Sequence, residues 1–428
     1  MPKLLIVVPT MHQGGQERVV VRTSRLLMQK YDITIAIFDG SDVGYDTEGL
    51  NIVNLDVPAK PGKINKLINI VKRVARLKRL KKQLKPDISY SYGPSANIIN
   101  ASSRVGTEKI WVGLRNYTDA VDVSKMKICV RGADLIVCCA RDIETEVKRR
   151  FGEETKTAVL YNLYDIDGIK AEATGAEPDD EWFEFMRKTQ LVKDAESVSA
   201  LGTDSTKSHI HLMSMGRDDD QKMFWHMLKT FKLIHEVVPE ARLTILGAGT
   251  WEGFKKMAEE LGIAKYVYFT GPQLNPYRFL KYGDIHWMTS RNEGFPNALA
   301  EGMVLGMASV STNCLTGPAE ILIEGGNTYQ ARVDFENWDV QPTDAGDARV
   351  KAIYGEYGII TPELSRERDM DSTNITDEER SLAEVMISLL QNEEMIGRYK
   401  QAAAARAQKY SYEAYVENFE RLASDYNT

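Results

Sequence analysis

The sequence predicts an α/β protein with two domains, each built on a parallel β-sheet of the Rossmann type. A chain of 428 residues is long enough for two or three domains of about 150 residues each. Short apolar, β-branched runs alternate with helical stretches, which is typical of a parallel sheet covered by helices. This alternation restarts near residue 209, so the second half has a plan similar to that of the first.

In the first half, Leu4-Leu5-Ile6-Val7-Val8 is continuously apolar and predicts a buried strand. A glycine-bearing loop at 10–16 and a helix over about 17–29 follow it. Further strands are predicted at 33–38, 87–90, 110–112, 135–138 and 158–160. The acidic stretch 165–208, with its Gly-Ala-Glu-Pro-Asp-Asp turn, predicts a connecting region.

In the second half, strands are predicted at 210–215, 243–246, 267–269, 285–288 and 308–311, and the last 45 residues or so are predicted to be helical. Residues 326–380 are polar with several turn signals and suggest no definite role. The expected boundaries are an N-terminal domain at 1–165, a connecting region at 166–208, a second domain at 209–409, and a final helix at about 410–428 that packs back on the first domain. A ligand should bind in the cleft where the two domains face each other, at the carboxyl ends of the strands.

The composition limits the class of protein further. Hydrophobic residues make up 43% and charged residues 27%, which is typical of globular proteins and excludes a chiefly disordered or collagen-like chain. No apolar stretch approaches the roughly 20 residues of a membrane-spanning helix, and the start, MPKLLIVVP, predicts a strand rather than a secretory signal. The cysteines lack CxxC spacing and predict buried reduced thiols in a cytosolic protein: Cys129, Cys138, Cys139 and Cys314.

The charge is unevenly distributed. The formal net charge is −7, yet residues 60–86 carry eleven Lys or Arg and no Asp or Glu. In this segment apolar residues recur at helical spacing: Ile64, Leu67, Ile68, Val71, Val74 and Ala75. One interpretation is a surface helix packed by that stripe, with a solvated cationic face. The other is a docking helix for anionic lipid, with contacts from Lys72, Arg73, Arg76 and Arg79. Nucleic acid ranks below both, because the segment lacks interleaved aromatic residues.

The segment 290–302, Ser-Arg-Asn-Glu-Gly-Phe-Pro-Asn-Ala-Leu-Ala-Glu-Gly, follows a predicted strand and opens a helix. Pro296 suits a first helical turn, and such a helix start offers free N–H groups and a positive dipole end to a phosphate. Glu293 and Glu301, about two turns apart on a similar face, can accept hydrogen bonds from sugar hydroxyls or a ribose. The alternative is a pair of solvated helix carboxylates.

A second strand, loop and helix carries Arg217 and Lys222, which could hold a diphosphate leaving group at about 1.5–3 kcal/mol per charged contact. The alternative is ordinary surface charge. The pair Gly14-Gly15 lets a backbone approach a phosphate, or forms only a tight turn. The acidic triplet 218–220 favours N-capping of a helix over metal binding. Gly247-Ala248-Gly249 fails as a dinucleotide fingerprint, because Glu252 stands where glycine is needed, and the scattered histidines predict no metal site.

As a set, these residues resemble the family-4 retaining glycosyltransferases of the GT-B fold over nearly the whole chain. The similar features are the glycine pair after the first strand, an Arg and a Lys five apart, and Glu293 and Glu301 with seven residues between them. Four strings also match in order and spacing: ILGAG (245–249), YFTG (268–271), GDIHWMTSRNEGFPNALAEGM (283–303) and GPAEIL (317–322).

The resemblance implies a role for each matching residue. Arg217 and Lys222 would bind the donor diphosphate and stabilise its departure, and Glu293 would contact the donor sugar near the reacting centre. Glu301 would hold the ribose, and further donor contacts would come from Gly14, Gly15, Gly294, Phe295, Pro296 and Asn297. Many relatives carry a histidine in the loop where this chain has Gly113-Leu114-Arg115-Asn116-Tyr117, and there we assign Arg115 and Asn116 to the acceptor side.

The resemblance also implies the reaction: retaining transfer of a hexose or N-acetylhexosamine from a nucleotide-diphosphate sugar, with UDP preferred. The expected acceptor is a growing, lipid-linked glycan of surface polysaccharide synthesis, and no metal or other cofactor is expected. The enzyme would be cytoplasmic, peripheral on the inner face of the cell membrane, without nucleic acid as a partner. The alternatives are a GT-B epimerase or phosphorylase of nucleotide sugars, and a non-catalytic protein that binds polyanions or membranes.

Overall fold

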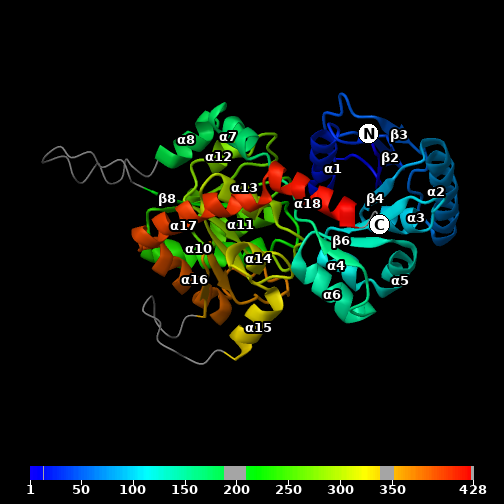
Figure 1. Ribbon diagram of the computed structural model, residues 1–428. Helices are drawn as coiled ribbons and strands as arrows, with labels where there is room; N and C mark the ends of the chain where they lie inside the picture. Colours follow the sequence, from blue (N-terminus) through cyan, green and yellow to red (C-terminus); the bar gives the residue numbers. More distant parts are fainter. Residues whose placement is uncertain (13, 188–208, 338–350, 426–428) are drawn as a thin grey trace, which may run out of the picture. The chain divides into compact units, whose positions relative to one another are not determined.

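The computed structural model describes residues 1–12, 14–187, 209–337 and 351–425, which form two units (Figure 1). Unit 1 comprises Met1–Tyr164 together with Tyr410–Thr428, and unit 2 comprises Asp165–Lys409. The chain therefore passes from one unit to the other twice. Each unit contains a predominantly parallel seven-stranded sheet covered by helices, which confirms the predicted fold class.

The sheet of unit 1 is parallel throughout, with the strand order β3-β2-β1-β4-β5-β6-β7. β1 lies between β2 and β4, and its continuous apolar character follows from burial on both faces. The strands are β1 (Lys3–Val8), β2 (Asp32–Ile37), β3 (Ile52–Asn54), β4 (Ile88–Tyr92), β5 (Lys109–Leu114), β6 (Leu135–Cys138) and β7 (Thr157–Val159).

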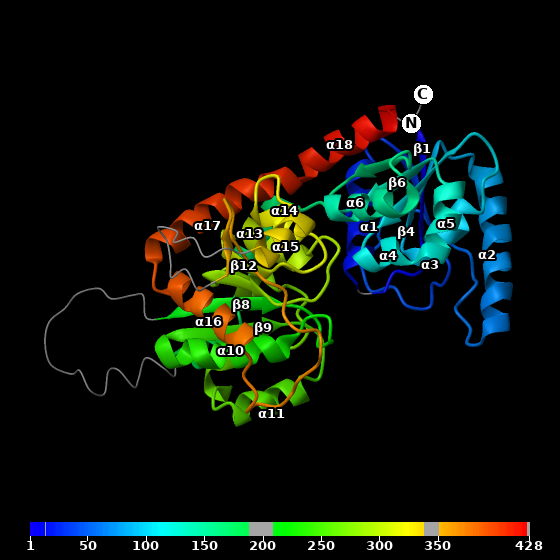
Figure 2. The same cartoon turned by 90° about the horizontal axis from the view of Figure 1, so that it is seen from below.

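Side chains of β1 alternate between two hydrophobic clusters, as the pleat of a strand requires. Leu4, Ile6 and Val8 pack with residues of α1 (Gly15–Leu27) and α18 (Tyr412–Asp425). Leu5 and Val7 pack on the other face with residues of α2 (Lys63–Leu84) and α3 (Pro94–Ala101), which lie together in both views (Figures 1 and 2). The remaining helices of unit 1 are α4 (Tyr117–Val121), α5 (Val123–Gly132) and α6 (Arg141–Phe151).

Helix α18 joins the core of unit 1 although it follows the whole of unit 2 in the sequence. The Phe419 ring lies edge-on to Tyr31, with centroids 5.5 Å apart, and its centroid is 5.4 Å from that of Trp111. The Tyr31 hydroxyl donates a hydrogen bond of 2.7 Å to Glu420. Burial, and to a lesser extent this contact, raises the pKa of Tyr31. An aromatic cluster therefore fastens this helix to the sheet.

The sheet of unit 2 has the order β10-β9-β8-β11-β12-β14-β13, in which only β13 is antiparallel to its neighbour. One face packs against α10, α11 and α16, and α13 and α17 contact strands of the same sheet. The strands are β8 (Ile210–Met215), β9 (Ala241–Leu246), β10 (Val267–Phe269), β11 (Ile285–Met288), β12 (Ala308–Thr312), β13 (Ile353–Tyr354) and β14 (Ile359–Thr361). The helices are α7 (Ile166–Thr174), α8 (Asp180–Arg187), α10 (Phe224–Val237), α11 (Glu252–Glu260), α12 (Tyr277–Leu280), α13 (Asn297–Val304), α14 (Pro318–Leu322), α15 (Thr328–Glu336), α16 (Asp377–Leu390) and α17 (Glu393–Ala407).

Two segments without a clear sequence signal have definite places in unit 2. The described part of the expected connecting region forms α7 and α8, and its buried Trp182 donates a hydrogen bond of 3.2 Å to Thr244. The rest of that region, 188–208, lies outside the described residues. In the segment 326–380, β13 and β14 extend the sheet, and Lys229 of α10 forms an ion pair of 2.7 Å with Asp369.

The basic helix α2 does not pack through the stripe that its spacing suggested. Four residues of that stripe, Ile64, Leu67, Ile68 and Val71, are 77%, 64%, 44% and 63% exposed. The interpretation of α2 as a helix packed by this stripe is therefore wrong. A second stripe, offset around the helix, faces the core instead: Ile70, Val74, Leu77, Leu80 and Leu84.

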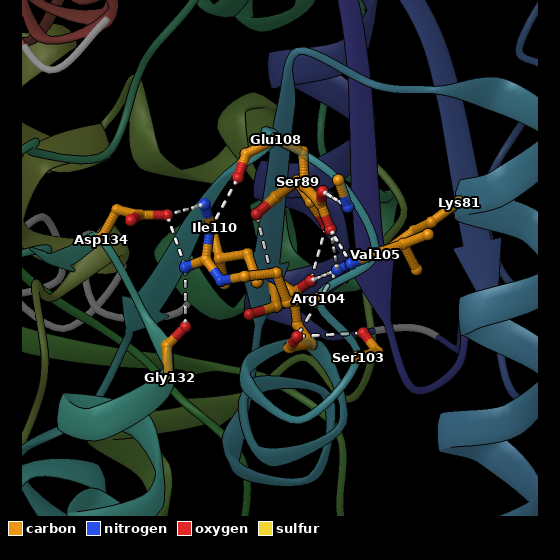
Figure 3. Close-up of polar contacts among 12 residues, drawn as sticks. Lys81, Ser89, Ser103, Arg104, Val105, Glu108, Ile110, Gly132 and Asp134 are labelled. Atoms are coloured by element: carbon orange, nitrogen blue, oxygen red, sulfur yellow. Dashed lines mark hydrogen bonds and ion pairs between the residues drawn. The ribbon is translucent and has the colours of Figure 1, made fainter. Parts of the chain in front are cut away.

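One of the basic residues of α2 is buried and anchors the helix. The Lys81 ammonium donates a hydrogen bond of 2.8 Å to Asn100 and lies 3.7 Å from the carboxylate of Glu108 (Figure 3). Burial lowers the pKa of Lys81 to about 8, against the opposing effect of Glu108. The same carboxylate accepts the backbone N–H groups of Val105 and Gly106, so the C-terminal half of α2 is fixed to the loop before β5.

Two further sequence observations have structural counterparts. All four cysteines are buried and free of disulfides, as predicted. Among the described residues, no helix has both the length and the apolar character required to cross a membrane.

Candidate active site

The candidate site lies at the carboxyl ends of β8 and β11, which are neighbours in the sheet of unit 2. From β8 the chain continues to β9 on one side, and from β11 it continues to β12 on the other. Ligands of open α/β sheets bind at such a point, because the loops diverge there and leave room above the strand ends. The loops concerned span 216–223 and 289–296 and contain most of the predicted donor-site residues.

Lys222 and Glu293 form the centre of this site. The Lys222 ammonium lies 2.5 Å from a carboxylate oxygen of Glu293, and their side chains are 18% and 10% exposed. They come from loops 71 residues apart in the sequence. A close, largely buried pair of opposite charges gives the site a fixed electrostatic pattern, since the protein supplies most of its surroundings.

The two loops are also joined through their backbones. Gln221 donates a side-chain hydrogen bond of 2.8 Å to the carbonyl of Asn292, and its own carbonyl accepts the N–H of Arg291 at 2.9 Å. Thr289 donates a hydrogen bond of 2.9 Å to the carbonyl of Lys222. Both partners of the ion pair are thus held in place by neighbours in the chain, which is the preorganisation that electrostatic catalysis requires.

Arg217 lies on the same loop as Lys222 but is far more accessible. Its side chain is 77% exposed and is 3.3 Å from the carboxylate of Asp219. A salt bridge this exposed contributes little to stability. The guanidinium can therefore turn toward an anionic ligand at small cost.

Three glycines allow the loops after β8 and β9 to meet. A Cβ on Gly247 would lie 1.8 Å from the carbonyl oxygen of Gly216, and a Cβ on Gly249 would lie 2.1 Å from Cβ of Asp218. A Cβ on Gly216 would lie 2.9 Å from the Lys222 side chain. Gly247-Ala248-Gly249 was set aside in the sequence because it is no dinucleotide fingerprint, yet it supports the loop that carries Lys222.

Helix α13 begins beside the ion pair, with Pro296 as its N-cap. The N–H groups of its first turn have no acceptor within the helix, so they form an anion-binding end directly after the 293–296 loop. Thr316, in the loop after β12, donates a hydrogen bond of 3.0 Å to the carbonyl of Gly294. Phe295 is buried, and Asn297 is the first helical residue.

Glu293 and Glu301 do not share a helical face, so that expectation is wrong. Glu293 precedes the helix in the loop, whereas Glu301 is within α13 and almost fully buried. The hydroxyl of Tyr277, in α12, donates a hydrogen bond of 3.0 Å to Glu301. Tyr277 was not identified from the sequence, because no local pattern links α12 to α13.

Under the site, β11 carries a histidine that the sequence reasoning did not use. His286 is fully buried, and a Cβ added to Gly302 of α13 would lie 3.1 Å from it. Burial, and to a lesser extent the positive charge of Lys222, lowers the pKa of His286 to about 3. The ring is therefore neutral. Cys314, after β12, is also buried, and burial raises its pKa well above the usual range.

The acidic triplet does not cap a helix, which corrects the N-capping interpretation. Helix α10 begins at Phe224 with Met223 as its N-cap and no side-chain cap. Each carboxylate of the triplet has another partner: Asp218 accepts the N–H of Trp251 at 3.0 Å, Asp219 that of Gln221 at 3.0 Å, and Asp220 lies 2.8 Å from Arg368. Among residues 1–12, 14–187, 209–337 and 351–425, no three His, Cys, Asp or Glu side chains are grouped as metal ligands.

The other predicted donor-site residues lie in unit 1. Gly14 is the N-cap of α1 and Gly15 its first residue, after the carboxyl end of β1. The Tyr45 hydroxyl accepts the N–H of Gly14 at 2.9 Å and donates to its carbonyl at 2.6 Å. The glycine pair therefore opens a helix at a strand end, which is the geometry of a phosphate-binding turn.

The proposed acceptor-side residues have structural partners in unit 1. Arg115 donates hydrogen bonds to the Tyr90 hydroxyl at 2.7 Å and to Asn162 at 3.1 Å, and its guanidinium lies 4.4 Å from the centroid of Tyr92. Asn116 caps α4 by accepting the N–H of Thr118 at 3.1 Å. The head group of Arg115 is thus directed into an aromatic cluster of its own unit.

Comparison with known proteins identifies the family. Two sequence families match this chain: Glycosyltransferase Family 4 over residues 13–167 and Glycosyl transferases group 1 over residues 203–339, together more than half of its length. The chain belongs to the family-4 glycosyltransferases of the GT-B fold. It is a glycosyltransferase of glycan or polysaccharide biosynthesis.

Relatives and solved structures agree with this. An uncharacterized glycosyltransferase of Methanocaldococcus jannaschii is 25% identical over 363 residues, or 80% of each chain. N-acetylgalactosamine-N,N'-diacetylbacillosaminyl-diphospho-undecaprenol 4-alpha-N-acetylgalactosaminyltransferase of Campylobacter jejuni is 22% identical, covering 79% of this chain and 88% of its own. Anabaena HepE in complex with UDP shares the fold, with a TM-score of 0.68 at 14% identity over 99% of this chain and 100% of its own.

Proposed function

We propose that this glycosyltransferase moves a hexose or N-acetylhexosamine from a nucleoside diphosphate sugar, with UDP preferred, to a growing lipid-linked glycan. The configuration at the anomeric carbon would be retained. The observation that carries the proposal is the Lys222–Glu293 pair, with its 2.5 Å separation, at the start of α13 between β8 and β11. This arrangement places a fixed cation, a carboxylate and an anion-binding helix end within one small site.

The chemistry requires stabilisation of a leaving group. When the bond between the anomeric carbon and the donor phosphate breaks, the nucleoside diphosphate takes the electron pair and its negative charge rises. Lys222, the accessible Arg217 and the N–H groups of α13 would stabilise that charge, so no metal ion is required in the proposal. Glu293 would lie beside the sugar, where positive charge develops, and Glu301 would hold the ribose.

The proposed donor and acceptor rest on relatives. UDP is bound in the HepE structure, and the name of the Campylobacter jejuni relative includes a diphospho-undecaprenol acceptor. A lipid-linked acceptor requires the enzyme to work beside a membrane. We therefore propose a peripheral enzyme on the inner face of the cell membrane.

Calorimetry with UDP, GDP, ADP and NAD, followed by the corresponding nucleotide sugars, tests the donor. We expect micromolar binding of UDP, which Lys222→Ala should weaken at least about tenfold. Lys232→Ala is the matched control, because Lys232 is a lysine of α10 whose ion-pair partner is Glu236 of the same helix. Absence of binding to every nucleoside diphosphate would contradict the proposal and favour a non-catalytic protein.

The stereochemistry and acceptor need a second experiment. Proton NMR of the product formed on a polyprenyl-diphosphate glycan should show the anomeric configuration of the donor. An inverted product would refute retention. Consumption of the nucleotide sugar at the same rate without any glycan would instead indicate an epimerase or a phosphorylase.

A further inference from the structure

The exposed face of α2 combines apolar and basic side chains in two halves. Its residues recur every three or four positions and so lie on one side of the helix. The N-terminal half is apolar and the C-terminal half is cationic. We call these residues the outer face of α2: Ile64, Leu67, Ile68, Val71, Ala75, Lys78, Arg79 and Lys82, each of which is exposed.

The exposure of the four apolar residues is not a consequence of a loosely attached helix. The opposite side of α2 packs into unit 1, where Leu77 and Leu80 are buried. The ion pair of Lys81 with Glu108 (Figure 3) fixes the helix rotation, since a rotation that turned the apolar half inward would expose this buried lysine. The apolar residues of the outer face are therefore presented to the surroundings by a well-anchored helix.

We propose that the outer face of α2 docks on an anionic phospholipid bilayer. The four apolar side chains would enter the boundary between head groups and acyl chains, while Lys78, Arg79 and Lys82 contact lipid phosphates. Charge complementarity supports this occupant, since residues 60–86 contain eleven basic and no acidic residues. Exposed aliphatic side chains also fit lipid better than nucleic acid, whose bases stack on aromatic rings. The purpose of this contact rests on the proposed function, which places a lipid-linked acceptor at the membrane.

The structure excludes two of the basic residues that the sequence suggested for contact with lipid. Arg73 donates hydrogen bonds of 3.0 and 2.8 Å to the carbonyl of Val57, and its guanidinium lies 4.5 Å from the Phe38 ring centroid. Arg76 donates to the carbonyls of Leu55 and Asp56. Both arginines are held against unit 1, so of the four contacts expected from the sequence only Lys72 and Arg79 remain candidates.

Vesicle flotation of the full chain tests the proposal directly. We expect binding to vesicles of equal parts phosphatidylglycerol and phosphatidylcholine, and little binding to phosphatidylcholine alone. Replacing the apolar residues together (I64S, L67S, I68S, V71S), or the basic ones together (K78Q, R79Q, K82Q), should lower the partition coefficient by at least about tenfold.

Matched controls test whether vesicle binding depends on the outer face of α2 or only on the overall charge and hydrophobicity of the protein. K127Q, R131Q and K156Q together remove the same charge from exposed residues elsewhere in unit 1. I128S and L274S remove exposed apolar side chains that do not belong to α2. Both control variants should bind the anionic vesicles as the unchanged protein does.

Insertion can be distinguished from purely electrostatic adsorption. The four native cysteines are buried, so Leu67→Cys can be labelled selectively with an environment-sensitive fluorophore. The emission should shift to the blue on anionic vesicles and be quenched by bromolipid, whereas the same label at Lys127→Cys should show neither change.

Each of several results would overturn the proposal. Vesicle binding that is absent, or that the outer-face variants leave unchanged, would refute it. Self-association that the apolar variant abolishes would identify a second copy of this chain as the occupant, and tighter binding to single-stranded RNA than to vesicles would identify nucleic acid. UDP binding in the same variants reports separately on the proposed function, because it should be unaffected by changes to α2.

Discussion

Opposite effects on nucleotide binding are expected from the two members of the Lys222–Glu293 pair. Lys222→Met removes the ammonium and keeps much of the side-chain length, whereas Glu293→Gln removes the negative charge and keeps the shape. In the structure the two groups are 2.5 Å apart. A diphosphate that approaches Lys222 must therefore compete with the Glu293 carboxylate.

The size of the expected change in UDP affinity follows from the contacts of the pair. A charge-assisted contact to the diphosphate contributes about 1.5–3 kcal/mol, so Lys222→Met should weaken UDP binding by about 10- to 150-fold. Glu293→Gln removes a negative charge close to the same anion and frees the ammonium, so it should strengthen UDP binding by a few fold. Both variants should lose transfer by about a hundredfold or more, because each removes an electrostatic contact of the transition state.

Isothermal titration with UDP and steady-state transfer kinetics measure the two effects. Lys232→Met is the matched control, because its partner Glu236 is one turn away on the same helix. The double variant completes a thermodynamic cycle and should show strong coupling, since the two side chains are in contact. Melting temperatures of all variants exclude unfolding as the cause.

Two results would refute this reasoning. If Lys222→Met and Glu293→Gln weaken UDP binding equally, the pair only stabilises the loops. Unchanged transfer in either variant would remove that residue from the catalytic machinery.

Three further outcomes concern stability and loop geometry. The folded protein holds His286 neutral with a pKa of about 3, whereas the histidine of the unfolded chain binds a proton below about pH 6.5. The free energy of unfolding should therefore be highest above pH 6.5 and fall on acidification, by about 2 kcal/mol down to about pH 5. Urea unfolding at pH 7 and pH 5 should show a smaller pH dependence for His286→Leu. Gly247→Ala should lower the transfer rate by about a hundredfold, because the new Cβ displaces the loop that it touches. Gly262→Ala is the control and should not lower the rate, since its new Cβ meets no atom within 4 Å. Equal transfer rates in the two variants would contradict the argument. Phe419→Ala should lower the free energy of unfolding of unit 1 by about 3–5 kcal/mol, measured by thermal or urea denaturation. Glu417 is exposed on the same helix, so Glu417→Ala should change this free energy little. A small effect of Phe419→Ala would mean that α18 is not needed for the stability of unit 1.

Local patterns predicted most strands of both sheets but not β3, β13 or β14. The continuous apolar run at 4–8 became β1, and the strand at 210–215 has the bounds given by its sequence. Parallel strands are buried on both faces, so their hydrophobicity is strong and unbroken. The family resemblance assigned Lys222 and Glu293 to one donor site, and the structure brings them together after β8 and β11, which are neighbouring strands of one sheet.

Local sequence patterns could not predict which elements contact one another in the fold. Helix α2 has two apolar stripes, and spacing alone shows that a stripe exists without showing which one meets the sheet. The stripe that faces the sheet is determined by the buried Lys81, whose partner Glu108 lies in the loop before β5. Similarly, the role of Gly247 depends on how closely a neighbouring loop approaches, and no single-sequence signal reports that distance.

The return of the chain to unit 1 has a consequence for biosynthesis. Tyr31 and Trp111 are translated early, yet Phe419, which packs on both, leaves the ribosome only after residues 165–409. During that interval the face of the N-terminal sheet that packs on α1 and α18 lacks the second of these helices, and its aromatic side chains can make non-native contacts. A nascent chain that stalls before α18 should therefore depend on chaperones, and the unit translated first is the last to be completed.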